Sequence, residues 1–179
     1  MTALVLADFD DIHWDGGRGK ADLLISCGDV DDNLIAEVSE AYKCQTVIAV
    51  RGNHDHSAHF AQSIIDLHLN KVEIKGVSFG GFQGSWKYKP RGNYLYEQDE
   101  VEEALKDFPR VDVFVAHNSP RRLHDKEDGT HYGFEAFNTY IKLRRPKIFI
   151  HGHQHIRRQT KVEETVVIGA YGVQVMQLL

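Results

Sequence analysis

Residues 23–55 read LLISCGDVDDNLIAEVSEAYKCQTVIAVRGNHD, and this stretch decides the fold. Its two apolar runs, residues 23–27 and 46–50, predict buried strands. Apolar side chains recur between them at helical spacing: Leu34, Ile35, Val38 and Ala41. A strand, a helix and a strand in succession predict a βαβ unit, whose two strands pair in parallel through a right-handed crossover.

A third apolar run, residues 4–7, precedes this unit and ends at Asp8. It predicts another buried strand of the same sheet. The carboxyl ends of the three strands then lie along one edge of the sheet, because parallel strands all end on the same side. We therefore expect Asp8, Asp29 and residues 51–54 to line that edge.

The rest of the chain predicts a second sheet. Residues 71–75 and 77–79 flank Gly76 as an antiparallel ribbon. Further along, a helix containing Val101, Leu105 and Phe108 ends at Pro109, and a strand, helix and strand follow at residues 111–116, 134–143 and 147–150. The tail, residues 162–179, predicts two closing antiparallel strands.

The composition is that of a globular protein. The 179 residues predict a single domain, 1–179, and 42% of them are hydrophobic. The net charge of −5 disfavours binding to nucleic acid or anionic lipid, which usually needs a basic excess. No apolar stretch approaches the ~20 residues of a membrane span, and no secretory signal is seen. With Cys27 and Cys44 interpreted as buried thiols, we expect a soluble, cytoplasmic protein.

Metal-ligand side chains gather at the predicted strand ends, in a sequence with 11 histidines: Asp8 to Asp10, Asp29 to Asp32, Asn53 to Asp55, His117 and Asn118, and His151 to His155. Carboxylate, amide and imidazole groups without thiolate favour Mn²⁺, Fe²⁺, Ni²⁺ or Zn²⁺ in a hydrolytic pair. His153 and His155 share one face of an extended chain, and Gly152 lets the backbone approach the ions. His151 is interpreted as structural.

These blocks, in this order, resemble the calcineurin-like metallophosphoesterase superfamily, whose signature is D-x-H, G-D-x-x-D, G-N-H-[DE], a lone histidine and G-H-x-H. The resemblance covers nearly the whole chain. Four blocks stand unchanged, at residues 28–32, 52–55, 117 and 152–155. The resemblance implies an α/β fold, a four-layer αββα sandwich of two mixed sheets flanked by helices.

The resemblance also implies a site with two divalent ions, for which we favour manganese. Asp8, Asp29 and His155 would hold one ion, Asp29 would bridge, and the second ion would have its own three ligands: Asn53, His117 and His153. A bridging carboxylate suits ions roughly 3.5–4 Å apart, which activate a shared water. His54 would be catalytic without binding metal, as proton donor to the leaving alkoxide.

One block departs from the family pattern. If Asp8 ends the first strand, the position of the D-x-H histidine holds Asp10, which we predict to be a metal ligand. A D-x-H does occur at residues 11–13, but it lies three residues beyond the strand end. The alternative for Asp10 is a hydrogen bond to a metal-bound water, or a turn cap.

Substrate contacts are predicted close to the lone histidine. Arg121 and Arg122 follow His117 and suit phosphate binding, although a solvated pair is the plainer interpretation. Residues 85–90 and 131–134 are further candidates for substrate loops. The predicted function is hydrolysis of a small phosphoester, either a monoester or a diester. The alternatives are a binding scaffold of the same fold and a nuclease, which the acidic charge disfavours; the oligomeric state is not predicted.

Overall fold

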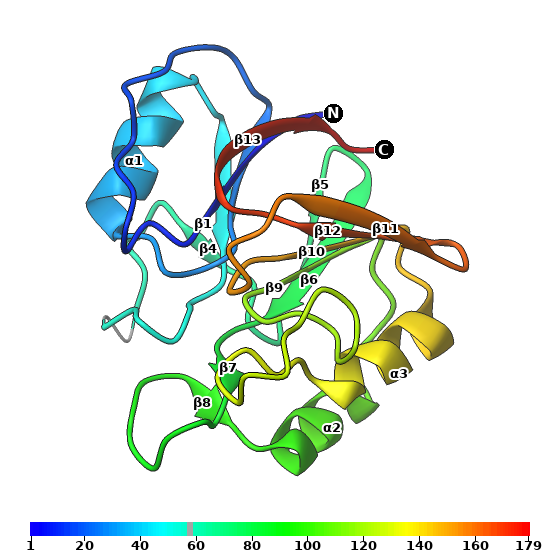
Figure 1. Cartoon of the computed structure of the whole chain (residues 1–179). Coiled ribbons are helices and arrows are strands. Elements are labelled where there is room, and N and C mark those ends of the chain that lie inside the picture. The colour runs from blue at the N-terminus through cyan, green and yellow to red at the C-terminus, as the bar shows by residue number, and fades with distance from the viewer. Residues whose placement is uncertain (57–58) are drawn as a thin grey trace.

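The computed structural model describes residues 1–56 and 59–179, which build two main β-sheets (Figure 1). The first sheet has the order β13-β1-β2-β3-β4, with these bounds: Gly172–Gln177, Thr2–Ala7, Leu23–Ser26, Thr46–Ala49 and Ile65–Asp66. The second has the order β11-β12-β10-β9-β6-β5: Arg158–Val162, Thr165–Gly169, Ile148–His151, Val113–Ala116, Val77–Phe82 and Lys71–Ile74. A short parallel pair, β7 (Ser85–Trp86) and β8 (Leu95–Tyr96), stands apart.

Strand β1 illustrates how the layers form. Successive side chains of a strand point to opposite faces of its sheet. Ala3 and Val5 therefore pack into the apolar cluster that joins the two sheets, where they meet Phe79 of β6. Leu4 and Leu6 point the other way, into a separate cluster with Ile35 of helix α1 (Asp32–Ala41). Both faces of the strand are buried, which explains its continuous apolar run.

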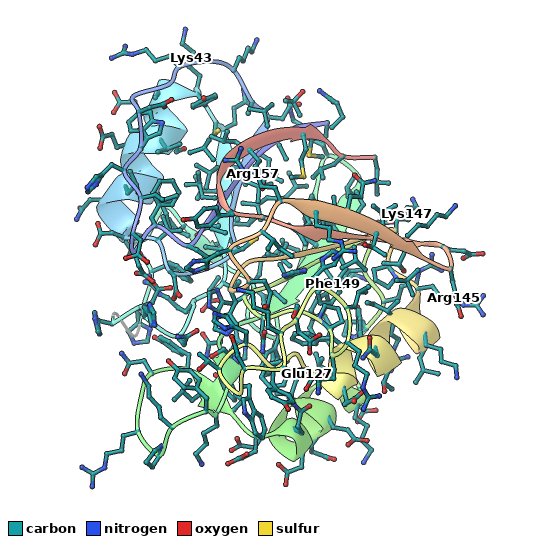
Figure 2. The ribbon with its side chains drawn as sticks, in the orientation of Figure 1. Lys43, Glu127, Arg145, Lys147, Phe149 and Arg157 are labelled. Atoms are coloured by element: carbon teal, nitrogen blue, oxygen red, sulfur yellow. The ribbon has the colours of Figure 1, made fainter. Side chains whose placement is uncertain are left out.

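The second sheet is covered on its outer face by α2 (Gln98–Lys106) and α3 (Glu135–Arg144). An aromatic-rich cluster fills this layer, in which the rings of Phe114 and Phe149 stack at 5.1 Å. Figure 2 shows Phe149 inside the ribbon, whereas Lys43 and Arg145 extend from its rim. One helix, two sheets and two helices in succession are the four-layer αββα sandwich, so the predicted fold class is confirmed.

Helices α1 and α2 begin at residues that cap their N-termini. Asp31 caps α1 by accepting a hydrogen bond from the backbone N–H of Asn33 at 2.8 Å. At α2, Glu97 and Glu100 form a capping box, so the acidic run there begins a helix. Acidic side chains at this end also complement the helix dipole.

The two sheets contain the predicted parallel arrangement. Strand β2 pairs in parallel with β1 and β3, and β9 pairs in parallel with β6 and β10. Ribbon β5–β6 is antiparallel, as predicted. The carboxyl ends of β1, β2 and β3 therefore emerge on one edge, as the sequence predicts.

The tail forms the two predicted strands, β12 and β13, but they lie in different sheets. Strand β11, which precedes them, was not predicted. Strand β12 pairs with β11 and β10, whereas β13 crosses over to pair antiparallel with β1. Strand β11 is polar and mostly exposed, so its sequence lacks the apolar pattern that predicts a strand. Gly172 turns the chain before β13, at a φ of 66°.

Two further expectations from the sequence concern membrane-spanning helices and the two cysteines. Within residues 1–56 and 59–179, no helix is long and apolar enough to cross a membrane. Both cysteines are free. Cys27 is buried as expected, whereas Cys44 is only half-buried because it lies in the turn between α1 and β3.

A polar brace at Asp112 joins β6 to the start of β9, and it gives a stability prediction. Asp112 Oδ2 accepts hydrogen bonds from the Ser78 hydroxyl at 2.7 Å and the Ser78 N–H at 3.0 Å. These bonds hold the pKa of Asp112 at about 2. Because this pKa is depressed, the stabilisation is fully present above about pH 4 and is lost as the pH falls towards 2. We expect Asp112→Ala to lower the free energy of unfolding by about 1–2 kcal/mol at pH 7, since the side chain is partly exposed.

Urea unfolding at pH 7, where the stabilisation is present, and near pH 2, where it is lost, measures this effect. The matched control is Asp107→Ala, which removes an exposed carboxylate from the end of α2. A loss in the Asp112 variant no larger than in the control would contradict the prediction.

Candidate metal centre

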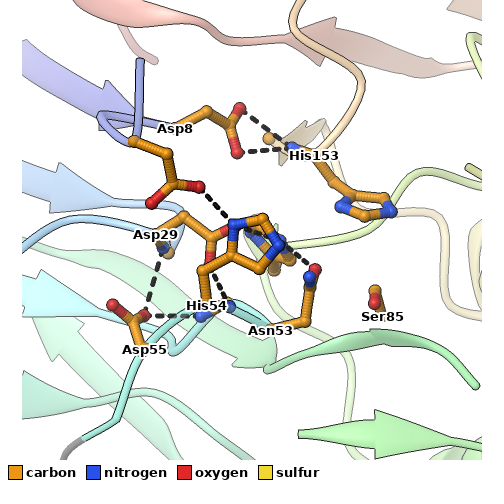
Figure 3. A network of polar contacts seen from close by, with 12 residues as sticks. Asp8, Asp29, Asn53, His54, Asp55, Ser85 and His153 are labelled. Carbon is orange, nitrogen blue, oxygen red and sulfur yellow. Dashed lines mark hydrogen bonds and ion pairs between the residues drawn. The ribbon is translucent and has the colours of Figure 1, made fainter. Parts of the chain in front are cut away.

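Five of the predicted ligands are brought to one edge of the sandwich by the ends of strands. Asp8 follows β1, Asp29 follows β2, Asn53 follows β3, His117 follows β9 and His153 follows β10. All five are at most 5% exposed. Figure 3 shows the carboxylates of Asp8 and Asp29 on neighbouring turns, with Asn53 and His153 beside them.

The backbone at these positions is held in an uncommon conformation. Asp8, Asp29, His153 and His155 all have left-handed φ angles, between 50° and 64°. Such strain persists only where the surrounding structure enforces it, and it concentrates at functional sites. At Gly52 a Cβ would lie 2.0 Å from Asp29 Oδ1, so only glycine lets this loop approach the carboxylate.

Three buried side chains form the centre of the cluster. Ligand atoms of Asp8, Asp29 and His117 all lie within 4.8 Å of one another. His117 Nε2 lies 3.3 Å from Asp29 Oδ2 and 3.0 Å from Asn53 Oδ1. The Asn53 amide nitrogen donates to the Tyr88 hydroxyl at 3.4 Å, which turns the amide oxygen towards the cluster.

Burial and neighbouring charge set the protonation of these groups. Burial raises the pKa of Asp8 to about 7. Burial would also raise the pKa of Asp29, but the adjacent His117 outweighs it and holds this pKa well below its ordinary value. Burial opposes a charge on His117, yet the Asp29 carboxylate prevails and raises the His117 pKa. The cluster thus favours positive charge at its centre.

The donor set fits a divalent cation. The oxygens of Asp8 and Asp29 are acceptors that lie within 4.8 Å of each other and of a ring nitrogen of His117, and the Asn53 amide oxygen is 3.0 Å from His117 Nε2. His117 Nδ1 donates to the Cys27 carbonyl at 2.8 Å, which directs Nε2 into the cluster. Metal-binding histidines typically have their second nitrogen held in this way, by a carbonyl or a carboxylate.

His153 is held in the same manner. Its Nε2 lies 3.3 Å from the Thr130 carbonyl, and its ring centroid is 5.0 Å from that of His117, although His153 is not one of the three residues whose ligand atoms lie within 4.8 Å of one another. Burial lowers its pKa well below the ordinary value, so the ring is neutral and has a lone pair for a metal. Its backbone N–H donates to both oxygens of Asp8 at 3.0 Å, which joins the ends of β1 and β10.

Two other predicted ligands lie outside the buried cluster. Asp10 contacts His54 Nδ1, and the two form a second group with Asp29 in which Asp10 and His54 are exposed. His155 is exposed and stacks on Tyr171, with ring centroids 5.0 Å apart and an interplanar angle of 17°. Both side chains are thus engaged by neighbours at the rim.

The predicted catalytic histidine lies beside the cluster. His54 is half exposed, and its backbone N–H donates to Asp29 Oδ1 at 2.8 Å. Its Nδ1 contacts Asp10, whereas Asp29 Oδ2 is 3.8 Å from the same nitrogen. His54 therefore adjoins Asp29 through its backbone while its ring faces the solvent side of the site.

The two predicted phosphate-binding arginines face carboxylates. Arg121 pairs with Asp125 at 2.5 Å and Glu127 at 2.8 Å, and it lies over the ring of Tyr132. Arg122 is largely exposed and lies 3.6 Å from Glu135. These contacts stabilise the loop after β9.

Sequence reasoning assigned no role to three buried polar residues of the site. Asp55 Oδ2 accepts from the backbone N–H groups of Asp29 at 3.1 Å and Gly52 at 2.7 Å, so it joins the two ligand loops. Asn118 and Gln154 are fully buried next to His117 and His153. The only available signal was their place inside the ligand motifs.

Comparison with known proteins agrees with this architecture. The sequence profile of the calcineurin-like phosphoesterase family matches residues 5–157. A search of curated proteins finds no match. Among solved structures, the protein TT1561 of Thermus thermophilus is similar at 14% identity and a TM-score of 0.60, with 96% of this chain and 89% of that chain covered.

Two further structures share the fold. Phosphopantetheinyl hydrolase from Mycobacterium tuberculosis has 13% identity and a TM-score of 0.60, covering 96% of this chain and 89% of its own. A Vps29 variant from Entamoeba histolytica has 13% identity and a TM-score of 0.54, covering 99% and 86%. At these identities the structures support the fold alone. The family profile spans most of the sequence, and the chain therefore belongs to the calcineurin-like phosphoesterase family.

Proposed function

We propose that the chain is a phosphoesterase that depends on two divalent ions bound at the carboxyl ends of its strands. The observation that carries the proposal is the buried convergence of the oxygens of Asp8, Asp29 and Asn53 on the imidazole of His117. Two carboxylates this close are costly to bury without a cation. Family membership supplies the reaction class.

The proposed ligands divide into two sets around Asp29. Asp8, Asp29 and His155 would hold one ion, and Asn53, His117 and His153 would hold the other with Asp29. Asp10 occupies the place of the family's D-x-H histidine, and its oxygen ligand favours hard ions such as Mn²⁺. When bound, such a pair supplies an activated water and polarises the phosphate oxygens. For Asp10 and His155 to bind these ions, Asp10 would have to leave His54 and His155 would have to leave Tyr171.

His54 is proposed to donate a proton to the leaving oxygen of the substrate. In the present structure Nδ1 contacts Asp10, and the ring adjoins the cluster because the His54 backbone N–H donates to Asp29. The half-exposed ring lets a substrate approach from the solvent side. Phosphate contact by Arg121 and Arg122 stays a prediction, and it requires them to leave the carboxylates that they now face.

A binding scaffold of the same fold is the second candidate. The observation that favours it is the position of Asp10 and His155, which are both exposed and held by neighbours outside the buried cluster. A scaffold could bind a single ion for stability alone. The two candidates differ in turnover, because only the enzyme hydrolyses a phosphoester.

Metal removal tests the proposed function. We expect hydrolysis of generic phosphomonoesters or phosphodiesters to stop after chelation and to return with Mn²⁺. An ion that binds only the folded state stabilises it by about 2.7 kcal/mol at a hundred times its Kd. A thermal melt of the stripped protein with and without Mn²⁺ therefore reports binding independently of activity. Stabilisation without turnover across the substrates would favour the scaffold, and chelator-resistant turnover would contradict the proposal.

A further inference from the structure

The loop between β9 and α3 contains a tight turn at residues 128–131. Asp128 Oδ1 accepts hydrogen bonds from the backbone N–H groups of Thr130 at 3.0 Å and His131 at 2.8 Å. Gly129, at a φ of 80°, supplies the left-handed residue that the turn needs. The turn thus has a local reason to hold its shape.

Three successive carbonyls of this loop contact side chains that belong to the metal centre or lie beside it. The Thr130 carbonyl lies 3.3 Å from His153 Nε2, and the His131 carbonyl accepts from Gln154 Nε2 at 2.9 Å. The Tyr132 carbonyl accepts from Asn118 Nδ2 at 2.7 Å. Gln154 and Asn118 are fully buried and adjoin proposed ligands. The loop is therefore positioned by the same strand ends that position the metal centre.

This arrangement places the imidazole of His131 next to the centre. Its ring centroid lies 5.2 Å from that of His153, which in turn lies 5.0 Å from that of His117. Asp128 Oδ2 engages His131 Nδ1 at 2.6 Å. The side chain is 25% exposed, so Nε2 is the nitrogen left for a ligand.

We propose that His131 contacts the substrate through a hydrogen bond between Nε2 and a phosphoryl group on the His153 side of the centre. The proposal rests on the proposed function, and it names the residue that orients the phosphate. The Asp128 carboxylate engages Nδ1 and fixes the orientation of the ring, so that Nε2 is the nitrogen presented to the ligand.

The competing role for His131 is purely structural. The loop could serve only to hold His153 through the Thr130 carbonyl, and the His131 ring would then be incidental. The two roles predict different effects of removing the His131 side chain. Loss of a support for His153 would lower the metal content, whereas loss of a substrate contact would weaken phosphate binding. Both quantities can be measured without turnover.

The test uses His131→Ala and the binding of inorganic phosphate to the Mn²⁺-loaded protein. A hydrogen bond to a charged group is worth enough to weaken phosphate binding by roughly 10- to 100-fold. We expect this loss, an equal loss in kcat/KM and an unchanged Mn²⁺ content. Asp128→Asn keeps an acceptor for the turn but removes the charge facing Nδ1, so it should give a smaller loss of the same kind.

The matched control is His59→Ala, which removes an exposed imidazole from another loop. Unchanged phosphate binding in the His131 variant would overturn the proposal, as would a loss of Mn²⁺, which would make the residue a support for His153. A parent protein that binds phosphate through His131 but hydrolyses no phosphoester would refute the proposed function and leave this contact standing.

Discussion

Replacing Asp29 with asparagine is expected to abolish both metal binding and hydrolysis. Asp29 belongs to both groups of candidate ligands, one with Asp8 and His117 and one with Asp10 and His54. Removing one partner of a buried charge pair costs about 3–5 kcal/mol, which corresponds to roughly 10²- to 5 × 10³-fold weaker binding. Because asparagine preserves the shape of the side chain, the loss reports the charge.

Metal content after equilibration with Mn²⁺ and turnover under the same conditions measure this effect. The matched control is Asp31→Asn, two residues away, because asparagine caps a helix about as well as aspartate and Asp31 is exposed. A variant at Asp29 that retains two ions would show that the shared ligand lies elsewhere.

Replacing His54 with alanine is expected to lower turnover by about 10²- to 10⁴-fold, the usual contribution of a general acid. Metal content should stay the same, because the contact of His54 with Asp29 runs through its backbone N–H, which alanine retains. Single-turnover kinetics and metal analysis of the purified variant test both parts of this expectation.

The leaving group gives a sharper version of the His54 test. A substrate whose leaving oxygen is already a weak base needs little protonation, so the variant should lose less activity on an aryl ester than on an alkyl ester. His59→Ala again serves as the control. Loss of metal in the His54 variant would identify the ring as a ligand, and an equal loss on both esters would remove its role as proton donor.

The sequence was informative about the elements because their signals are local. The continuous apolar run of β1, the helical spacing in α1 and the capping box of α2 each involve residues close in the chain. The dependence on local signals also explains why strand β11 was not predicted. Strand β11 carries polar, half-exposed residues, and its partner is chosen by contacts that no short pattern records.

Most candidate ligands could be predicted for a related reason. Parallel strands end on the same edge, so motifs at the ends of β1, β2, β3, β9 and β10 come together once the sheets form. That Asp8 and Asp29 of the first sheet meet His117 of the second was implied by the family resemblance of these motifs. Their burial follows from the apolar strands that precede them.

The sequence, with its family resemblance, was enough to predict the four-layer fold and that Asp8, Asp29 and His117 lie close together. Only the tertiary structure decided how the rim side chains are engaged: Asp10 contacts His54 across 44 positions, His155 stacks on Tyr171, and Gln154 and Asn118 hold the loop of His131. The physical reason is the range of the interactions. Strands and helices follow from periodic burial within a few residues, whereas these contacts depend on where loops from different strands approach one another in space.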